Sequence, residues 1–510
     1  MKVLLINPPR YYWPYLSEGD NYILPQALPC LAAILRENNI DVKPIDCLPL
    51  KMGWKTLERT IEKEQPDVVG VTTSETMFTP EGVKLCELAK KIDPSIKTVA
   101  GGAHFSNLAE ESVSEYPIDF IVVGEGEITL LELAKELEKK EQNLKKVDGI
   151  VFKKDGDVIR TKPRKLVENL DDLPMPAYDM MPMKEYGKEK LLFSPGGTTI
   201  HHSRGCVHNC KFCVWWVQMS QRKLIGGKEV CFPKWRTKSV ERTLDEVELL
   251  TKKYKKKYLE FVDDTWNVDP AWSGKFADGV KERGLNFNWF GFMRADYILR
   301  DEKAGIFKKI ADSGLVKLCI GAERALNEDL KMFGKTGYSH DLTKKCFHLL
   351  RDKYPQVFRQ GTFIVGVRNE TKESMRNLLE YAKELDLDFP SFHPITPIPG
   401  TELWDTAVRN NWIEEKNYLC FDWLTPVMSS EHMSRKEIFE TIAEITRDYI
   451  RPSWYLRGIT SKYRFKRNLY LWFTAISMRA LKDTIRQRIA KKDGVKNVFT
   501  ELVKPDWYDT

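Results

Sequence analysis

The sequence predicts an α/β protein with three parts: a small doubly wound N-terminal domain, a partial (β/α)6 barrel and a helical C-terminal region. Through about the first 135 residues, and again from about 198 to 400, short apolar strands alternate with helical patterns. Such alternation is typical of parallel sheets whose faces are covered by helices. After about residue 405 the patterns are mostly helical, and no further parallel strand is indicated.

Length and composition agree with a multidomain globular protein. The chain has 510 residues, which at about 150 residues per domain suggests roughly three domains. Hydrophobic residues make up 42% and charged residues 30%, which excludes a disordered or fibrous chain. The net charge of +7 is too small to indicate nucleic-acid binding by itself.

Neither a membrane span nor a secretion signal is indicated. No run reaches the roughly 18 apolar residues expected of a transmembrane helix. Residues Met1–Asn7 have the pattern of a buried strand that meets two prolines at once, rather than that of a signal peptide. Three of the ten cysteines are clustered and seven are scattered. We therefore expect a reduced, cytoplasmic protein with one metal-type cluster rather than a disulfide framework.

The N-terminal domain, residues 1–138, is predicted to be doubly wound and flavodoxin-like. Its expected strands are Val3–Ile6, Val42–Ile45, Val68–Thr72, Thr98–Gly101 and Phe120–Gly124. A ligand of such a domain lies beyond the carboxyl ends of the strands. The loops at that edge are Asn7–Trp13, Thr72–Thr79, Gly101–Ser106 and Gly124–Glu127.

The rest of the chain is predicted as a connector over 139–195, an open or partial barrel over 196–404 and a helical region over 405–510. The connector contains a hairpin pattern at Ile150–Arg160 and several prolines. Six strands are too few for a full eight-stranded barrel. They are expected at Thr198–His202, Tyr258–Val262, Trp289–Phe292, Val316–Ile320, Gly361–Val367 and Phe392–Ile395.

Three cysteines stand close together after the first strand of the barrel. Cys206, Cys210 and Cys213 have the spacing C-x3-C-x2-C, and three thiolates on one loop favour zinc or an iron–sulfur cluster. Structural zinc sites usually have four ligands, and the chain has no second C-x2-C pair. Three cysteines on a [4Fe–4S] cluster instead leave one iron open for a small molecule. The alternative is a zinc loop completed by His208 or Cys231.

This loop, with Phe212 before the third cysteine, resembles the signature of the radical S-adenosylmethionine (SAM) superfamily, and Phe212 is accordingly expected beside SAM. Five further motifs resemble that superfamily in order and spacing, and together they are far more specific than any one alone. They are Phe261-Val262-Asp263-Asp264, Arg294-Ala295-Asp296, Ile320-Gly321-Ala322-Glu323-Arg324, Phe363-Ile364-Val365-Gly366 and Thr396-Pro397-Ile398-Pro399-Gly400-Thr401. Arg324 departs from the usual serine, and Arg368-Asn369 from the usual proline-glycine.

The resemblance also implies which residues position SAM on the open iron. Glu323 is expected to accept hydrogen bonds from the ribose hydroxyls, and Arg294 to balance the carboxylate. Asp263 or Asp264 is expected near the methionine ammonium. From the residues alone, the alternatives are an exposed Arg294–Asp296 ion pair and a strand-end cap at Asp263.

The N-terminal domain resembles the cobalamin-binding domain that is fused to radical SAM enzymes. The resemblance lies in Ile6-Asn7-Pro8-Pro9, Leu24-Pro25, Leu31-Ala32, Val71-Thr72-Thr73-Ser74, Ala100-Gly101-Gly102-Ala103-His104 and Gly124-Glu125-Gly126-Glu127. Glycines at strand ends permit close approach of the backbone to a ligand, and hydroxyl groups can bond a nucleotide tail. The implied cobalamin contacts are Thr72, Ser74, Gly101, Gly102, His104, Gly124 and Glu125. A generic nucleotide-binding fold is the alternative for the isolated domain.

One departure from other cobalamin carriers concerns the cobalt ligand. Such carriers place D-x-H-x-x-G after the first strand, whereas the loop here is Asn7-Pro8-Pro9-Arg10-Tyr11-Tyr12-Trp13. We therefore expect no histidine ligand from this loop, and we expect His104 to contact the tail or cap a helix. The lower face of cobalt is expected under Thr72–Met77 or under Tyr11–Trp13, and the sequence does not choose between them.

The C-terminal region is strongly basic. Residues 451–496 hold 13 Lys or Arg against two acids, with aromatic residues interleaved. The functional interpretations are a docking surface for an acidic protein or a helix at a membrane surface. The alternative is a basic helix packed on the barrel by its aromatic side. The region does not resemble a known RNA-binding module.

The resemblance as a whole implies a cobalamin-dependent radical SAM enzyme, and we expect a C-methyltransferase that uses a [4Fe–4S] cluster, SAM and cobalamin. The family's chemistry needs a radical because an unactivated carbon has no lone pair to attack the SAM methyl group. It also needs a reducing partner of flavodoxin or ferredoxin type. The basic tail favours an acidic protein or peptide as substrate. The alternatives are a non-methylating anaerobic oxidative cyclase, and a corrinoid carrier with a structural zinc.

Overall fold

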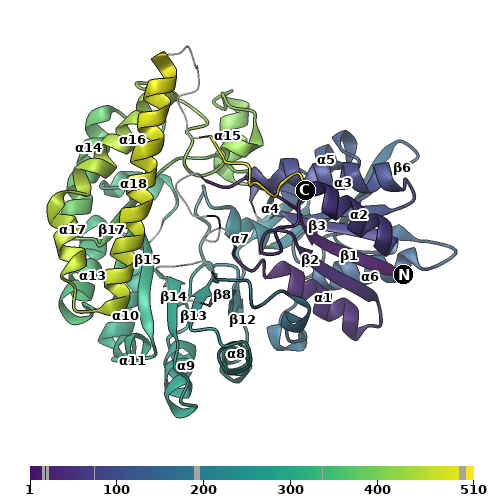
Figure 1. Cartoon of the computed structure of the whole chain (residues 1–510), viewed down its shortest axis with the longest axis horizontal. Coiled ribbons are helices and arrows are strands. Elements are labelled where there is room, and N and C mark those ends of the chain that lie inside the picture. Colours follow the sequence, from purple (N-terminus) through teal and green to yellow (C-terminus); the bar gives the residue numbers. More distant parts are fainter. Residues whose placement is uncertain (14–17, 19–21, 74, 189–195, 336, 493–500) are drawn as a thin grey trace.

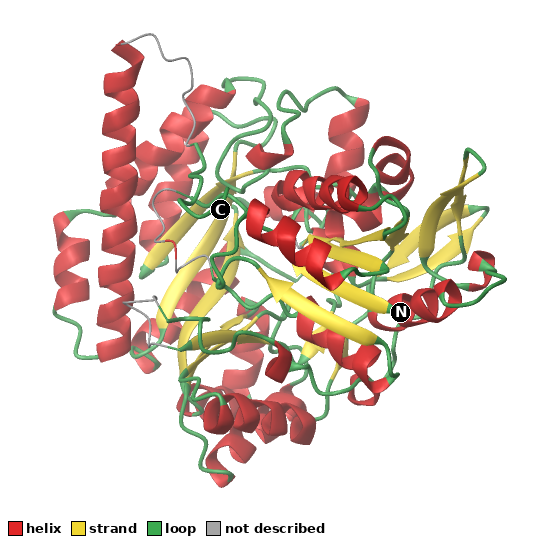
Figure 2. Cartoon of the chain, turned by 45° about the vertical axis from the view of Figure 1, so that its right-hand side comes forward, coloured by secondary structure: helices red, strands yellow, loops and turns green. Residues whose placement is uncertain are grey.

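The computed structural model describes residues 1–13, 18, 22–73, 75–188, 196–335, 337–492 and 501–510. Two mainly parallel sheets lie side by side, each covered by helices, and the last long helices pack against the second sheet (Figures 1 and 2). This arrangement confirms the predicted fold class.

The first sheet has seven strands in the order β2-β1-β3-β4-β5-β6-β7. Their bounds are β1 Lys2–Asn7, β2 Asp41–Asp46, β3 Val68–Thr73, β4 Lys97–Gly102, β5 Phe120–Val122, β6 Ile150–Lys154 and β7 Asp157–Arg160. The first five strands are parallel, and β6 pairs antiparallel with the edge strand β5. The hairpin that the sequence places in the connector is therefore an extension of the first sheet.

Both faces of this sheet are buried, which explains its near-continuous apolar strands. In β1, Val3 and Leu5 face one core, while Leu4 and Ile6 face the other. Helices α1 (Ala27–Glu37) and α6 (Glu127–Leu137) cover the first face. Helices α2 (Trp54–Glu64), α3 (Thr79–Ile92) and α5 (Ala109–Glu115) cover the second, and the short α4 (Ala103–Asn107) follows β4.

The second sheet has six parallel strands in the order β17-β16-β15-β14-β13-β8. The strands are β8 Gly197–Ile200, β13 Tyr258–Phe261, β14 Asn288–Phe292, β15 Leu315–Glu323, β16 Phe358–Val365 and β17 Phe389–Pro394. The helices between them are α7 Val214–Gln218, α8 Val240–Glu248, α9 Pro270–Glu282, α10 Ala295–Lys303, α11 Ile306–Asp312, α12 Asn327–Met332, α13 His340–Lys353 and α14 Lys372–Glu384. The topology is the partial (β/α)6 barrel that the sequence predicts.

The C-terminal region is helical and packs on the barrel. Its helices are α15 Glu402–Arg409, α16 Arg435–Tyr449, α17 Pro452–Ile459 and α18 Arg464–Lys492. Phe473 and Leu469 of α18 are buried with Phe290 and Phe358 of the strands. Leu259 and Phe261 of β13 belong to the core under the barrel helices, while Tyr258 belongs to the core under α18. Because neighbouring residues of a strand point to opposite faces, α18 packs on the face opposite to α8–α14, and Figure 1 shows it beside β15 and β17.

A buried carboxylate fixes these helices to the barrel. Asp388, just before β17, accepts a hydrogen bond from the Tyr470 hydroxyl at 2.7 Å and lies 2.8 Å from Lys466 Nζ and 3.0 Å from Arg359 Nε. The aromatic side of the basic region therefore packs on the barrel, which is the alternative named for this region from the sequence. No described helix is long and apolar enough to cross a bilayer.

Residues 501–510 return to the N-terminal domain (Figure 1). Val503 forms an antiparallel bridge with Tyr12, and the amide of Trp54 donates to the carbonyl oxygen of Tyr508 at 2.9 Å. Trp507 and Tyr508 are buried there. The approach is so close that a Cβ on Gly53 would lie 2.0 Å from the Trp507 carbonyl oxygen. The tail thus holds the loop after β1, at the edge where the ligand is expected.

Candidate functional site

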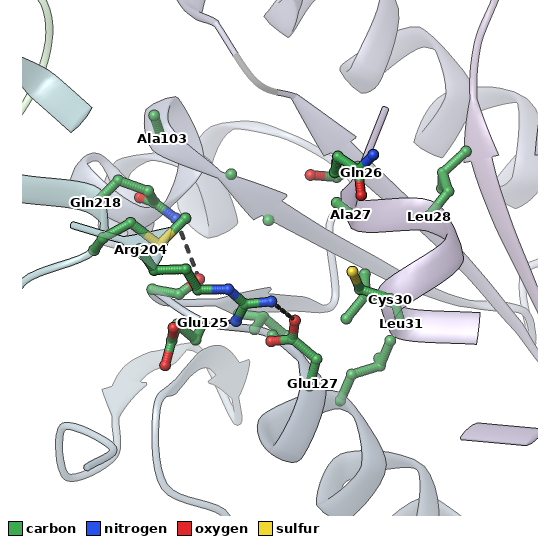
Figure 3. Close-up of a pocket in the computed structure, with 18 of the residues that line it drawn as sticks. Gln26, Ala27, Leu28, Cys30, Leu31, Ala103, Glu125, Glu127, Arg204 and Gln218 are labelled. Carbon is green, nitrogen blue, oxygen red and sulfur yellow. Dashed lines mark hydrogen bonds and ion pairs between the residues drawn. The ribbon is translucent and has the colours of Figure 1, made fainter. Parts of the chain in front are cut away.

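A cavity of about 280 Å³ opens at the carboxyl edge of the first sheet (Figure 3). Its walls are mostly apolar and come from β1, β3, β4, α1 and α6, together with residues of the barrel domain. The predicted ligand contacts Thr72, Gly101, Gly102, Gly124 and Glu125 all line it. So do Ser203, Arg204 and Gly205 of the cysteine loop, and Asp264. Residues from both predicted cofactor domains therefore share one cavity.

The glycines at this edge have different roles. A Cβ on Gly101 would make ordinary contact, 3.5 Å from the Val122 carbonyl oxygen. Gly102 has φ +100°, and its Cβ would lie 2.0 Å from the carbonyl oxygen of Thr73. Gly102 is therefore required by the close approach of β3 and β4. A bulky residue there would strike the backbone of β3 before it could fill ligand space.

One predicted contact, His104, lies outside the cavity, and another falls on a residue that the structure does not describe. His104 is 1% exposed and packs edge-on against Phe105 and against Tyr418 of the C-terminal region, with ring centroids 5.6 and 4.6 Å apart. It does not line the cavity, and burial lowers the pKa of His104 to about 4. Ser74 lies outside the described residues.

Glu125 pairs with two arginines of the barrel domain. Its carboxylate oxygens lie 3.1 Å from Arg204 Nη1 and 2.9 Å from Arg236 Nη1. Burial alone would raise the pKa of Glu125, but the two guanidinium groups outweigh burial and lower it. Arg204 also reaches Glu127, with 2.6 Å between Nη2 and Oε1 (Figure 3). Glu125 therefore joins the two domains as well as lining the cavity.

The cysteine loop begins at β9 (Ser203–Arg204), which pairs antiparallel with β12 (Arg236–Thr237). Gly205 turns the chain with φ +79°, and its Cβ would lie 2.0 Å from the Lys234 carbonyl oxygen. Cys213 is the N-cap of α7 (Val214–Gln218). Burial raises the pKa of Cys206, Cys210 and Cys213 in the free-thiol form.

The donor chemistry of this loop fits an iron–sulfur cluster, although the thiols are not preassembled around a metal position. Among the described residues, no three His, Cys, Asp or Glu side chains already converge to hold a metal ion. His208 Nε2 lies 3.0 Å from the Tyr297 hydroxyl, and Cys231 lies in the separate strand β11 (Lys228–Phe232). What fits is the donor set itself, three soft thiolate ligands within eight residues of one loop.

The two neighbouring aspartates after β13 have different surroundings. Asp263 is fully buried and accepts from the amide and hydroxyl of Ser203, both at 2.6 Å, and from the amide of His202 at 3.1 Å. It thereby braces the start of the cysteine loop. Asp264 lines the cavity, and its Oδ2 is buried with no hydrogen-bond partner among the described residues. Burial, and then the charge of Asp263, raise the pKa of Asp264 to about 7. Asp264 is therefore the better placed of the two to meet an ammonium group.

The other predicted SAM residues already have partners. Arg294 forms a two-point ion pair with Asp296 at 3.0 and 2.9 Å, and this pair is mostly buried instead of exposed. Glu323 Oε1 lies 2.7 Å from Lys335 Nζ. Phe212 packs edge-on against Phe333, with ring centroids 5.4 Å apart.

Sequence reasoning missed several residues of the site. His201, Arg204 and Gln218 line the cavity, and Lys335 pairs with Glu323. For Arg204 a signal existed, since a charged side chain two residues before Cys206 faces an acidic motif at 124–127. Lys335 is separated from its partner by a helix, and nothing in the local pattern indicates the contact.

Comparison with protein families finds two matching domains. Residues 13–134 match the B12 binding domain, and residues 200–382 match the Radical SAM superfamily. An uncharacterized methyltransferase of Pyrococcus horikoshii is 31% identical over 91% of this chain and 96% of its own length. The anaerobic magnesium-protoporphyrin IX monomethyl ester cyclase of Rubrivivax gelatinosus is 26% identical over 87% of this chain and 76% of its own length.

The fold is also found among solved structures. The radical S-adenosylmethionine methyltransferase TsrM from Kitasatospora setae, with cobalamin and a [4Fe-4S] cluster bound, matches with a TM-score of 0.67 at 16% identity. The match covers 94% of this chain and 100% of that chain.

Proposed function

Because the chain belongs to the cobalamin-dependent radical SAM enzymes, we propose that it transfers a methyl group from SAM, by way of cobalamin, to an unactivated carbon of its substrate. The observation that carries this proposal is the shared cavity. Gly101 and Gly124 of the B12 binding domain line the same space as Ser203, Gly205 and Asp264 of the radical SAM domain. Two cofactors bound at these positions would lie next to each other, which the transfer of a methyl group from one to the other requires.

Cys206, Cys210 and Cys213 would hold the [4Fe–4S] cluster, and Asp264, Arg294, Glu323 and Phe212 would surround SAM. Asp264 offers an oxygen with no partner in the described part of the chain, so an ammonium group there would give a buried carboxylate a partner. We place the cluster-binding domain at 196–404, after a B12 binding domain at 1–138.

The cavity would hold only part of cobalamin. Its volume of about 280 Å³ is slightly below the range of small-molecule sites, roughly 300–1,000 Å³, and its walls are mostly apolar. Both features suit the planar aromatic base of the nucleotide tail. When bound, the cluster with SAM supplies a carbon radical, and cobalamin supplies the methyl group. Thr72 can donate its hydroxyl to the tail, while Leu28, Leu31 and Leu130 exclude water from it.

A cyclase reaction is the second candidate, because a relative at 26% identity is an oxidative cyclase. The methyltransferase is favoured by the relative at 31% identity. We further propose a cytoplasmic location, a flavodoxin- or ferredoxin-like reductant, and a protein or peptide substrate. The exposed side chains of Arg464, Arg479 and Lys482 in α18 would attract an acidic partner.

Mass spectrometry of an anaerobic reaction with methyl-deuterated SAM tests the proposal. Candidate substrates should gain one deuterated methyl group. A substrate that loses hydrogen without gaining the label would favour the cyclase.

A further inference from the structure

The loop 124–127 of the B12 binding domain holds both ends of the cysteine motif. Before the motif, Arg204 reaches Glu125 at 3.1 Å and Glu127 at 2.6 Å. After it, Gln218 at the end of α7 donates from Nε2 to the Gly124 carbonyl oxygen at 3.2 Å. Figure 3 shows Arg204 and Gln218 pointing into this loop. A single four-residue segment thus contacts the chain on both sides of the three cysteines.

These contacts are buried. The side chains of Arg204, Glu125 and Glu127 are 9%, 6% and 8% exposed. Arg236, paired with Arg204 in the β9–β12 ladder, adds a second cation on Glu125. Glu127 is the first residue of α6, where a carboxylate is also stabilised by the helix dipole. Removal of Arg204, Glu125 or Glu127 would leave a buried charge unpaired, which is strongly destabilising. A movement of the loop 124–127 would break the same ion pairs unless the cysteine loop moved with it.

The same side chains form a wall of the cavity. Arg204, Glu125, Glu127 and Gln218 all line it, so a ligand in the cavity touches the groups that fix the cluster loop. A ligand that orders these side chains lowers the loss of conformational entropy that accompanies binding of the next ligand.

We propose that Arg204 is a positioning residue that couples the cobalamin cavity to the cluster and SAM site. This inference rests on the proposed function, in that cobalamin enters the cavity. Its consequence is reciprocal: SAM should tighten cobalamin binding, and cobalamin should tighten SAM binding by the same factor. Lysine in place of Arg204 keeps the charge but lacks the planar fork that spans two carboxylates.

The test measures hydroxocobalamin affinity of the anaerobic, cluster-containing full-length protein, with and without SAM. We expect SAM to tighten binding about fivefold or more in the wild type, and less than about twofold in Arg204→Lys and in Glu127→Gln. The control is Arg164→Lys, whose partner Glu132 lies within the N-terminal domain away from the cavity. It should keep the full factor.

Melting temperature and the electron paramagnetic resonance (EPR) signal of the reduced cluster identify variants that fail to fold or to load iron. If Arg204→Lys fails either check, the comparison uses Glu127→Gln, which keeps hydrogen-bonding capacity. A wild type that binds cobalamin with no response to SAM would overturn the inference alone, as would variants with the full wild-type factor. A wild type that binds no cobalamin would overturn the proposed function itself.

Discussion

Lys335 Nζ lies 2.7 Å from Glu323 Oε1 and 2.6 Å from the carbonyl oxygen of Gly321. Glu323 has φ +59° at a register shift between β15 and β16, a backbone conformation that a residue other than glycine rarely adopts. The carboxylate at the end of β15 therefore has a cation beside it before any ligand binds. Ribose hydroxyls can still donate to its second oxygen.

Replacing Glu323 by alanine should weaken SAM binding by about 1–3 kcal/mol, the usual range for a hydrogen bond to a charged group. Iron content should stay unchanged. Calorimetry measures the affinity. Because Glu323→Ala also strands Lys335, the matched variant is Lys335→Met. If Lys335→Met weakens SAM as much as Glu323→Ala, the carboxylate acts only through the ion pair.

Leucine at Gly101 should block the cavity without disturbing the sheet. Its Cβ meets only ordinary contacts, and Gly101 lies on the same face of β4 as Val99, which lines the cavity. We expect about a tenfold or greater loss of cobalamin affinity, since roughly 1.4 kcal/mol of steric clash suffices. Visible titration measures it, with an unchanged melting temperature as the control. Wild-type affinity in this variant would place the ligand elsewhere.

Bound Co(II) cobalamin should show no nitrogen splitting in its EPR spectrum. The loop 7–13 holds no histidine, and His104 packs against Tyr418 outside the cavity. The variant His104→Leu should leave the spectrum unchanged. Splitting that persists in this variant would contradict the prediction and leave two ligands to test, the base of cobalamin itself and His201, which lines the cavity.

Asparagine at Asp388 should destabilise the protein by about 3–5 kcal/mol, because it leaves the buried cations of Arg359 and Lys466 without their charge partner. Those cations lower the pKa of Asp388 although burial opposes them. The stabilisation is therefore complete above the unfolded-state pKa near 4 and is lost as pH falls below it. Denaturant unfolding at neutral and acidic pH measures both effects.

Asp386→Asn is the matched control for Asp388→Asn, since Asp386 is 34% exposed and pairs with Arg457 at the surface. It should cost less than about 1 kcal/mol. Equal losses in the two variants would contradict the anchoring role of Asp388. By the same argument, truncation after Asp448 should unfold the barrel rather than remove only a docking surface.

The strands, the cysteine loop and the cavity-lining glycines could be predicted because their signals are local. Val3–Ile6 is apolar at every position, and three cysteines lie within eight residues. The partners of charged groups could not be predicted in this way. Arg204 and Glu127 are 77 residues apart. Which of Asp263 and Asp264 faces the cavity depends on the exact residue at which β13 ends, and the sequence pattern does not fix that residue. The contact of Trp507 with Gly53 also joins distant parts of the chain, and no periodic pattern in the sequence indicates it.

The most direct test of the central claim follows the methyl group of SAM in the anaerobic protein reduced with cobalamin present. SAM with a deuterated methyl group should label the bound cobalamin and, in the same protein, be cleaved to 5′-deoxyadenosine. Changing Cys206, Cys210 and Cys213 together to alanine should abolish the cleavage and the iron. Cleavage by the wild type with no label ever found on cobalamin would contradict the methyltransferase, and iron retained in the triple variant would contradict the assignment of the cluster.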